Sequence, residues 1–214
     1  MSRDSNNSVE ERLVFEPAQL TGKEKSVTEE KKDVELALAE SLKSLAVRTP
    51  FEKITIKQIT DGAGVIRVTF YNHFQDKYDL LGYIVRREIL EPVRILLKNS
   101  MYREALILIF SNVKKDSAFY QKAYKIEGQN SFEEITENCI YELLLEQFSE
   151  RRSGKPHSKF PWLTVETMAR YYARSMNYVV MEWIRSGMAV APEEVADIYE
   201  YIMSHSLWDT LDEL

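Results

Sequence analysis

The sequence holds little of what builds disulfide-linked, metal-bound or many-turned β proteins. It has one cysteine in 214 residues, together with only 7 glycines and 6 prolines. A single thiol excludes an intramolecular disulfide and a cysteine-rich zinc site, and it is typical of a protein of the reducing cytoplasm. So few turn-forming residues disfavour a β-sandwich and favour long helices. We therefore expect an all-α, cytoplasmic protein.

Long apolar runs and catalytic motifs are missing as well. The longest charge-free apolar run, Ala105–Phe110, is far shorter than the roughly 20 residues of a membrane-spanning helix. The first residues contain no apolar stretch of the kind found in secretory signals. There is no P-loop, no G-x-G-x-x-G, no G-x-S-x-G and no paired acid and base. We therefore expect no membrane span, no cofactor and no metal, and we hold an all-helical enzyme only as an alternative.

The net charge of −6 hides an uneven distribution along the chain. Residues 31–98 hold 12 basic and 9 acidic side chains, whereas residues 99–214 hold 12 basic and 18 acidic ones. A basic segment inside an acidic protein is typical of an anion-binding module. The first hundred residues are therefore the part in which to look for a nucleic-acid contact.

Helix start and stop signals recur along the chain. Hydroxyl residues followed three positions later by Glu or Gln form capping boxes at Ser26, Thr55 and Ser131. Pro50 ends the first helix, and Gly64 suits a left-handed turn after the second. Further helices are predicted over residues 67–74, 76–91, 101–114, 117–127, 131–150, 163–186 and 192–207.

These signals divide the chain into three parts. Residues 1–25 are polar and show no period, so we expect a mobile N-terminal arm. Residues 26–91 form a first helical domain, because Pro92 interrupts or kinks the fourth helix. Residues 92–214 form a second helical domain, in which the Gly- and Pro-containing stretch 151–161 is an internal loop.

Two short helices joined by the Gly64 turn, behind a longer helix, have the outline of a helix-turn-helix. Their inner faces are apolar, through Ile56, Ile59, Ala63, Val65, Phe70 and Phe74. The outer face of the second short helix offers hydrogen-bond donors for phosphates and base edges: Arg67, Thr69, Tyr71, Asn72 and His73. The alternative is an ordinary buried helical hairpin.

The segment ITIKQITDGAGVIRVTFYNHFQDKYDLL, residues 54–81, resembles the DNA-binding region of TetR-family transcription regulators. The resemblance is carried by an ordered string, Thr69-Phe70-Tyr71, His73-Phe74, Asp76-Lys77 and Leu80-Leu81, and it covers about residues 27–90. It implies a three-helix DNA-binding domain followed by a helical dimerisation and ligand domain. It also implies a sequence-specific regulator that binds near-palindromic double-stranded DNA as a homodimer.

The same resemblance implies a role for each matching residue. Thr55 caps the helix that abuts the DNA backbone, and four residues face the major groove: Arg67, Val68, Thr69 and Asn72. Phosphates are contacted by Tyr71, His73 and Lys77. The alternative for His73 is a histidine satisfied within the core.

Two positions depart from the family pattern. Ile66 replaces the usual Ser before the Arg, so the recognition helix lacks a side-chain N-cap. Val68 replaces a small residue, and it either touches a thymine methyl group or blocks closer approach to the bases. Both departures bear on which bases are preferred.

The remainder resembles the regulators grouped with dihydroxyacetone-kinase operon activators, through Phe119-Tyr120 and the late segment 183–188 followed by Pro192-Glu193-Glu194. The wider family implies dimerisation through the last two helices and a small-molecule pocket. Candidate pocket residues are Tyr120, Tyr172, Met176 and Trp183, for which plain core is the alternative. Repression is the family default, whereas the subgroup indicates an activator controlled by a protein co-regulator.

Overall fold

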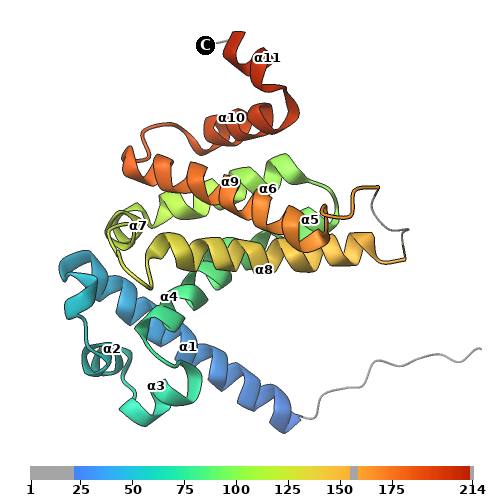
Figure 1. Ribbon diagram of the computed structural model, residues 1–214. Helices are drawn as coiled ribbons and strands as arrows, with labels where there is room; N and C mark the ends of the chain where they lie inside the picture. Colours follow the sequence, from blue (N-terminus) through green and yellow to red (C-terminus); the bar gives the residue numbers. More distant parts are fainter. Residues whose placement is uncertain (1–21, 155–158, 213–214) are drawn as a thin grey trace, which may run out of the picture. The chain divides into compact units, whose positions relative to one another are not determined.

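The computed structural model describes residues 22–154 and 159–212, and within these ranges every regular element is helical (Figure 1). The all-α expectation is therefore confirmed. The N-terminal elements are α1 (Gly22–Arg48), η1 (Phe51–Lys53), α2 (Ile56–Ala63), α3 (Arg67–His73), α4 (Lys77–Ile84) and η2 (Val85–Leu90). They are followed by η3 (Glu91–Val93), α5 (Arg94–Lys98), α6 (Tyr102–Lys115), α7 (Ser117–Ala123), α8 (Phe132–Arg152), α9 (Val165–Arg185), α10 (Pro192–Ser204) and α11 (Leu207–Asp212). None of the described helices has the length and apolar character needed to span a bilayer.

The first helix starts earlier than its capping signal predicts. α1 begins at Gly22, four residues before Ser26. Residues 1–21 of the predicted arm lie outside the described residues, and so does the side chain of Ser26. The described residues from Val34 onward belong to one compact unit, and the packing reported below lies within it.

A tightly filled core holds the N-terminal helices together. Seven side chains from α1, α2, α3 and α4 are completely buried in it: Leu38, Leu42, Ile59, Phe70, Leu80, Leu81 and Ile84. α2 ends at Gly64, whose φ of +69° is the left-handed value expected for this turn. A Cβ on Gly62 would lie 2.3 Å from Ser41 Oγ, so glycine is what lets α2 approach α1 this closely.

The helix after α3 changes its pitch and does not stop at Pro92. α4 passes into a π-helical segment, η2, and then into the 3₁₀ turn η3, which contains Pro92, before α5 resumes as α-helix. A π turn accommodates one extra residue per turn, so the side chains that follow it are rotated relative to an uninterrupted α-helix. The predicted interruption is thus real, but it begins seven residues before the proline.

A cluster of charges joins α1 to the later helices. Lys43 Nζ lies 2.9 Å from Glu88 Oε1 and 2.7 Å from Asp116 Oδ2, and it donates a hydrogen bond to each carboxylate. Burial lowers the pKa of the Lys43 ammonium, but Asp116 and Glu88 outweigh this effect and raise the pKa above its usual value. The ammonium therefore stays charged and ties together three segments that are distant in sequence.

The C-terminal helices pack in pairs. α8 and α9 run side by side in opposite directions (Figure 1), and α6 packs against α10. A buried hydrogen bond of 2.7 Å from Thr136 Oγ1 to Asn177 Oδ1 fixes the register of α8 against α9. α8 extends through Arg152, two residues into the predicted loop, of which residues 155–158 lie outside the described residues.

The predicted last helix over residues 192–207 is two helices. α10 ends at Ser204, His205 is extended with a φ of −111°, and α11 begins at Leu207. Ser206 Oγ accepts a hydrogen bond from Asp209 N, and Asp209 Oδ2 accepts one from Ser206 N. This reciprocal cap marks the start of a new helix, and the prediction of one uninterrupted helix over 192–207 overlooks it.

Candidate nucleic-acid interface

Thr55 fixes the start of α2, as its capping-box pattern predicts. Its Oγ1 accepts a hydrogen bond of 3.2 Å from Gln58 N, and Gln58 Oε1 accepts one of 2.9 Å from Thr55 N. Both partners are exposed. The cap therefore sets where α2 begins and leaves the Thr55 side chain open to solvent.

The start of α3 has no such cap. Ile66 occupies the N-cap position without a side-chain hydrogen bond, as its departure from the family pattern predicts. Ile66 is 69% exposed and Val68 is 64% exposed. Two β-branched apolar side chains thus project into water at the beginning of the helix, a costly arrangement for residues that contact nothing.

The outer face of α3 carries an ordered pair of side chains. Arg67 donates a 3.0 Å hydrogen bond to the Tyr71 hydroxyl, and its guanidinium carbon lies 5.4 Å from the centre of the Tyr71 ring. Asn72 is exposed beside them and Thr69 is half-buried, whereas Phe70 is completely buried. The contact and core faces therefore separate as predicted, and the face open to solvent is rich in hydrogen-bond donors.

His73 lies differently from Arg67 and Tyr71. Its Nδ1 is 3.2 Å from Glu35 Oε1 on α1, and only 11% of its side chain is exposed. The ring is therefore largely used in holding α3 to α1, as the core-satisfied alternative describes. One ring nitrogen, Nε2, is left for any contact outside the protein.

Lys77 has protein partners where the family resemblance implies a phosphate. Its ammonium donates hydrogen bonds of 2.8, 3.1 and 3.0 Å to the backbone oxygens of Phe51, Glu52 and Ile54. Burial lowers the pKa of this ammonium. With these three N–H donors in use, Lys77 braces η1 against α4, and its predicted phosphate contact stays a prediction.

The N-terminus of α4 is also largely occupied. Asp76 Oδ1 accepts hydrogen bonds from the backbone N–H groups of Tyr78 and Asp79, at 2.8 and 2.9 Å. These are the amides that would otherwise face an external anion. The helix end therefore has few free amides to offer a phosphate.

Two exposed cations of η1 and α2 are absent from the contacts predicted from the sequence. Lys53 ends η1, and Lys57 lies in the first turn of α2 with 78% of its side chain exposed. Among the described residues Lys57 pairs with Asp61, four residues along the same helix, at 2.6 Å. The signal for Lys57 is its place two residues after the Thr55 cap, on the solvent face of the helix that precedes the turn.

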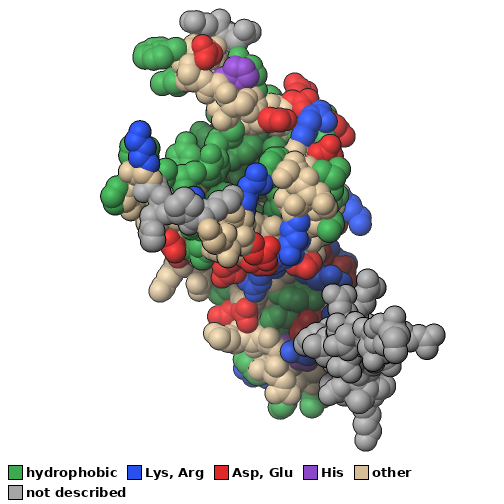
Figure 2. All heavy atoms as spheres, turned by 90° about the vertical axis from the view of Figure 1, so that its right-hand side faces the viewer, with side chains coloured by type: hydrophobic (Ala, Val, Ile, Leu, Met, Phe, Trp, Pro, Cys, Tyr) green, Lys and Arg blue, Asp and Glu red, His purple; other side chains and the backbone are tan. Residues whose placement is uncertain are grey.

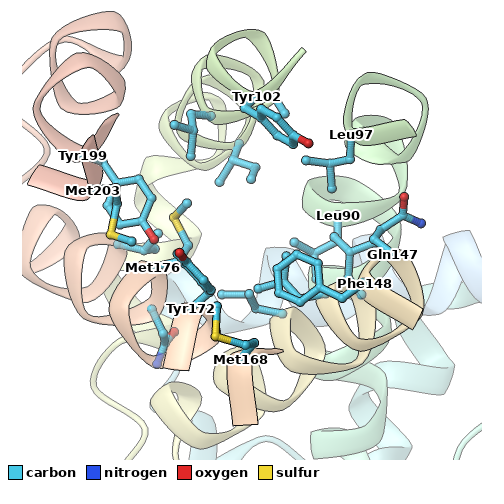
Figure 3. Close-up of a pocket in the computed structure, with 18 of the residues that line it drawn as sticks. Leu90, Leu97, Tyr102, Gln147, Phe148, Met168, Tyr172, Met176, Tyr199 and Met203 are labelled. Carbon is cyan, nitrogen blue, oxygen red and sulfur yellow. The ribbon is translucent and has the colours of Figure 1, made fainter. Parts of the chain in front are cut away.

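A large cavity lies among the C-terminal helices. It has a volume of about 1230 Å³ and is lined by residues of η2 and of α5 to α10. Figure 3 shows Tyr102 and Leu97 facing Tyr172 and Met176 across it. Three of the four predicted pocket residues, Tyr120, Tyr172 and Met176, line this cavity.

The fourth predicted pocket residue, Trp183, is not part of the cavity wall. Its Nε1 donates a 3.0 Å hydrogen bond to the Val190 backbone oxygen, and its ring packs edge-on against Phe110 at 5.3 Å. Trp183 is 4% exposed and acts as core. The aromatic pattern of α9 does not distinguish these faces, because core and cavity wall are both apolar.

Within the described residues no three His, Cys, Asp or Glu side chains converge as a metal site would require. Cys139 is buried, and burial raises the pKa of its thiol. Its Sγ lies 3.7 Å from the Gly82 backbone oxygen, to which it donates a hydrogen bond. The thiol therefore serves the packing of α8 against α4.

Comparison with known proteins agrees with this arrangement. Residues 41–84 match the family described as "Bacterial regulatory proteins, tetR family", and residues 102–205 match "Transcriptional regulator C-terminal region". The HTH-type dhaKLM operon transcriptional activator DhaS of Lactococcus lactis subsp. lactis (strain IL1403) is 26% identical over 159 residues. That match covers 70% of this chain and 79% of the relative.

Solved structures share the fold. The dihydroxyacetone kinase operon activator DhaS has a TM-score of 0.51 and 22% identity, over 79% of this chain and 93% of the other. NalD of Pseudomonas aeruginosa, the secondary repressor of the MexAB-OprM multidrug efflux pump, has a TM-score of 0.54 and 15% identity over the same shares. With an exposed, donor-rich α3 behind a capped α2, and with both halves of the chain matched, the protein belongs to the TetR family of DNA-binding transcriptional regulators.

Proposed function

We propose that two copies of the chain bind a near-palindromic operator, each placing α3 in the major groove. The observation that carries this proposal is the outer face of α3, where Arg67, Tyr71 and Asn72 are exposed while Phe70 is buried. A two-fold dimer places two recognition helices in successive major grooves, about 34 Å apart. Phosphate contacts supply much of the affinity and make it fall with salt.

The exposed side chains divide between bases and phosphates. Arg67 and Asn72 suit base edges, Val68 and Ile66 suit thymine methyl groups, and Thr69 lies beside them. Tyr71 suits a phosphate, with Thr55 capping the helix next to the backbone. Lys53 and Lys57 add positive charge near the same helices. His73 retains one free nitrogen for a phosphate, whereas Lys77 holds the site together from within.

The homodimer forms through the outer faces of α9 and α10. Large apolar side chains project from these faces: Tyr171, Tyr178, Ile198 and Ile202 are between 45% and 66% exposed. Side chains of this size on two neighbouring helices are typical of a surface that another protein covers. Dimerisation through the last two predicted helices, which the family resemblance implies, would bury them.

Ligand control is the second part of the proposal. A small molecule in the C-terminal cavity shifts the population of DNA-binding conformations. The protein acts as a repressor. It is not an enzyme, and it works in the cytoplasm. The alternative is an activator controlled by a protein co-regulator. The curated relative, which is named as an operon activator, favours that alternative sign of regulation.

DNA binding is tested with duplexes selected from a random pool by the purified full-length protein. Fluorescence anisotropy then compares the selected duplex with an unselected one. Arg67→Ala should lose about 1–3 kcal/mol on the selected duplex and discriminate less between the two. Tyr71→Phe should weaken binding to both duplexes by a similar factor.

Lys122→Gln, an exposed change on α7, serves as the matched control and should leave both affinities unchanged. If Arg67→Ala and Tyr71→Phe bind both duplexes as tightly as the parent protein, the assignment of α3 to the groove is wrong.

A further inference from the structure

The cavity, called the channel from here on, is lined by residues along the length of α8. Its wall includes residues at helical spacing along one face of that helix: Phe132, Thr136, Ile140, Leu143, Leu144, Gln147, Phe148 and Arg151. At 1.5 Å per residue this face is about 28 Å long. The volume of about 1230 Å³ exceeds the about 300–1,000 Å³ of ordinary ligand sites. The shape therefore suits an elongated molecule rather than a compact one.

Most of the wall is apolar, and this excludes a highly polar occupant. Leu106, Ile109 and Val113 of α6 face the interior, as do Met168 and Met176 of α9. A charged group placed among them would lose its hydration without gaining an ionic partner. The middle of the channel therefore takes a hydrocarbon body.

One end of the channel is polar, and its polarity is unbalanced. Gln147 lines this end, on the side opposite Tyr199 and Met203 (Figure 3). Gln147 Nε2 is buried and has no hydrogen-bond partner among the described residues. An amide donor left in this state costs about 1–3 kcal/mol, which a ligand oxygen would recover.

Positive charge gathers at the same end. Charged side chains of the cavity wall are Lys98, Arg151, Arg152 and Lys159, against Glu150 and Glu200. Lys98 pairs with Glu150 at 3.5 Å. Arg151 donates its hydrogen bonds to the hydroxyls of Tyr102 and Ser100, and no described carboxylate forms an ion pair with it. Figure 2, which faces this side of the molecule, shows a green apolar recess with blue side chains beside it.

We infer that the cavity binds an elongated apolar molecule with one acidic headgroup, of the long-chain carboxylate class. The headgroup accepts hydrogen bonds from Gln147 Nε2 and pairs with Arg151, while the hydrocarbon body lies along α8 between α6 and α9. A carboxylate satisfies both groups at once, because an ionised acceptor forms the stronger hydrogen bond. This inference rests on the proposed effector-sensing role of the C-terminal helices and names the ligand class.

Isothermal titration calorimetry of the full-length protein tests the inference with three probes of equal chain length. These are myristate, its uncharged methyl ester and the cationic tetradecyltrimethylammonium. Myristate should bind at least tenfold more tightly than the other two. Equal affinity for all three probes, or no binding of any, overturns the inference.

Variants locate the headgroup. Arg151→Gln and Gln147→Leu should each weaken myristate binding at least fivefold and leave the methyl ester within twofold, whereas Lys122→Gln should change neither. Thermal melting of each variant shows that it is folded, and Leu144→Trp, which fills the channel, should abolish binding of all probes. Unchanged myristate affinity in Arg151→Gln overturns the inference.

DNA binding by the same samples is measured separately with the selected duplex. Failure of myristate to bind removes the ligand class and leaves the DNA-binding proposal in place. Failure to bind DNA, with myristate bound as expected, removes the proposed function and leaves the ligand site.

Discussion

The N-terminal helices and the C-terminal helices use apolar residues in opposite ways. Between α1 and α4 the large apolar side chains fill the interior, and seven of them are completely buried. Between α6 and α10 similar side chains surround a channel of about 1230 Å³. The two buried side-chain atoms without a partner in the described residues, Tyr120 OH and Gln147 Nε2, both belong to residues that line this channel.

The difference agrees with the roles proposed above for the two parts. A recognition helix has to be held rigidly, because its side chains read base edges within hydrogen-bond distances. A sensing domain needs room and unmatched polar groups, which lower its own stability in the empty state. The filled N-terminal core therefore suits a rigid recognition helix, and the C-terminal cavity leaves space for a ligand.

The largest effect in this comparison is expected for matched leucines. Leu81→Ala removes a completely buried side chain and should cost about 2–5 kcal/mol of unfolding free energy. Leu144→Ala removes a half-buried side chain that borders the channel, so fewer contacts are lost and the cost should stay below about 2 kcal/mol. Urea unfolding of the two variants measures both values, and equal costs would remove the distinction between filled and hollow parts.

A medium effect on the unfolding free energy is expected at Lys77, which tests the contact between α4 and η1. Lys77→Met abolishes three hydrogen bonds to backbone oxygens and should cost about 1–3 kcal/mol. Lys57→Met, in which the lost side chain is largely exposed, should cost less than about 0.5 kcal/mol. Urea unfolding checks both variants.

The salt dependence of DNA binding separates the two roles of Lys77. If Lys77 only holds η1 against α4, the slope of log affinity against log salt concentration is unchanged in Lys77→Met. A slope reduced by about one, with unchanged stability, would instead assign Lys77 to a phosphate.

The smallest effect is expected at Tyr120, inside the hollow part. Tyr120→Phe removes a hydroxyl without a partner, so the unfolding free energy should change by less than about 0.5 kcal/mol or increase. Thr136→Val, by contrast, breaks the buried hydrogen bond to Asn177 and should cost about 1–3 kcal/mol. Thermal melting compares the two, and a large loss in Tyr120→Phe would show that its hydroxyl has a partner in solution.

The sequence predicts most of the N-terminal part because its signals are local. The Thr55 capping box, the Gly64 turn and the four-residue spacing of Phe70 and Phe74 each act within a few positions. Lys77 escapes this reasoning, since its partners lie 23 to 26 residues earlier in the chain. The exposed face of α3 is predictable, whereas the bases that it prefers are not.

The C-terminal part is less predictable because one apolar pattern serves two purposes. Tyr172 and Trp183 lie on the same helix and look alike in the sequence, yet the first lines the channel and the second is core. The choice depends on which side chains meet from α6 and α10. Helical periodicity fixes the inward direction and carries no information on whether the space there is filled.

The π-helical segment η2 gives the two parts a common backbone. Val85, Ile89 and Leu90 line the channel, and they continue directly from Leu80 and Leu81 in the core beneath α3. A bound molecule that displaces Leu90 would therefore rotate η2 relative to α4, because α4 is held in the core beneath α3. η2 is where this helix leaves regular α-helical geometry, so we expect the rotation to occur there first. A one-residue deletion in η2 would rotate the channel-lining side chains about the helix axis relative to the core side chains of α4.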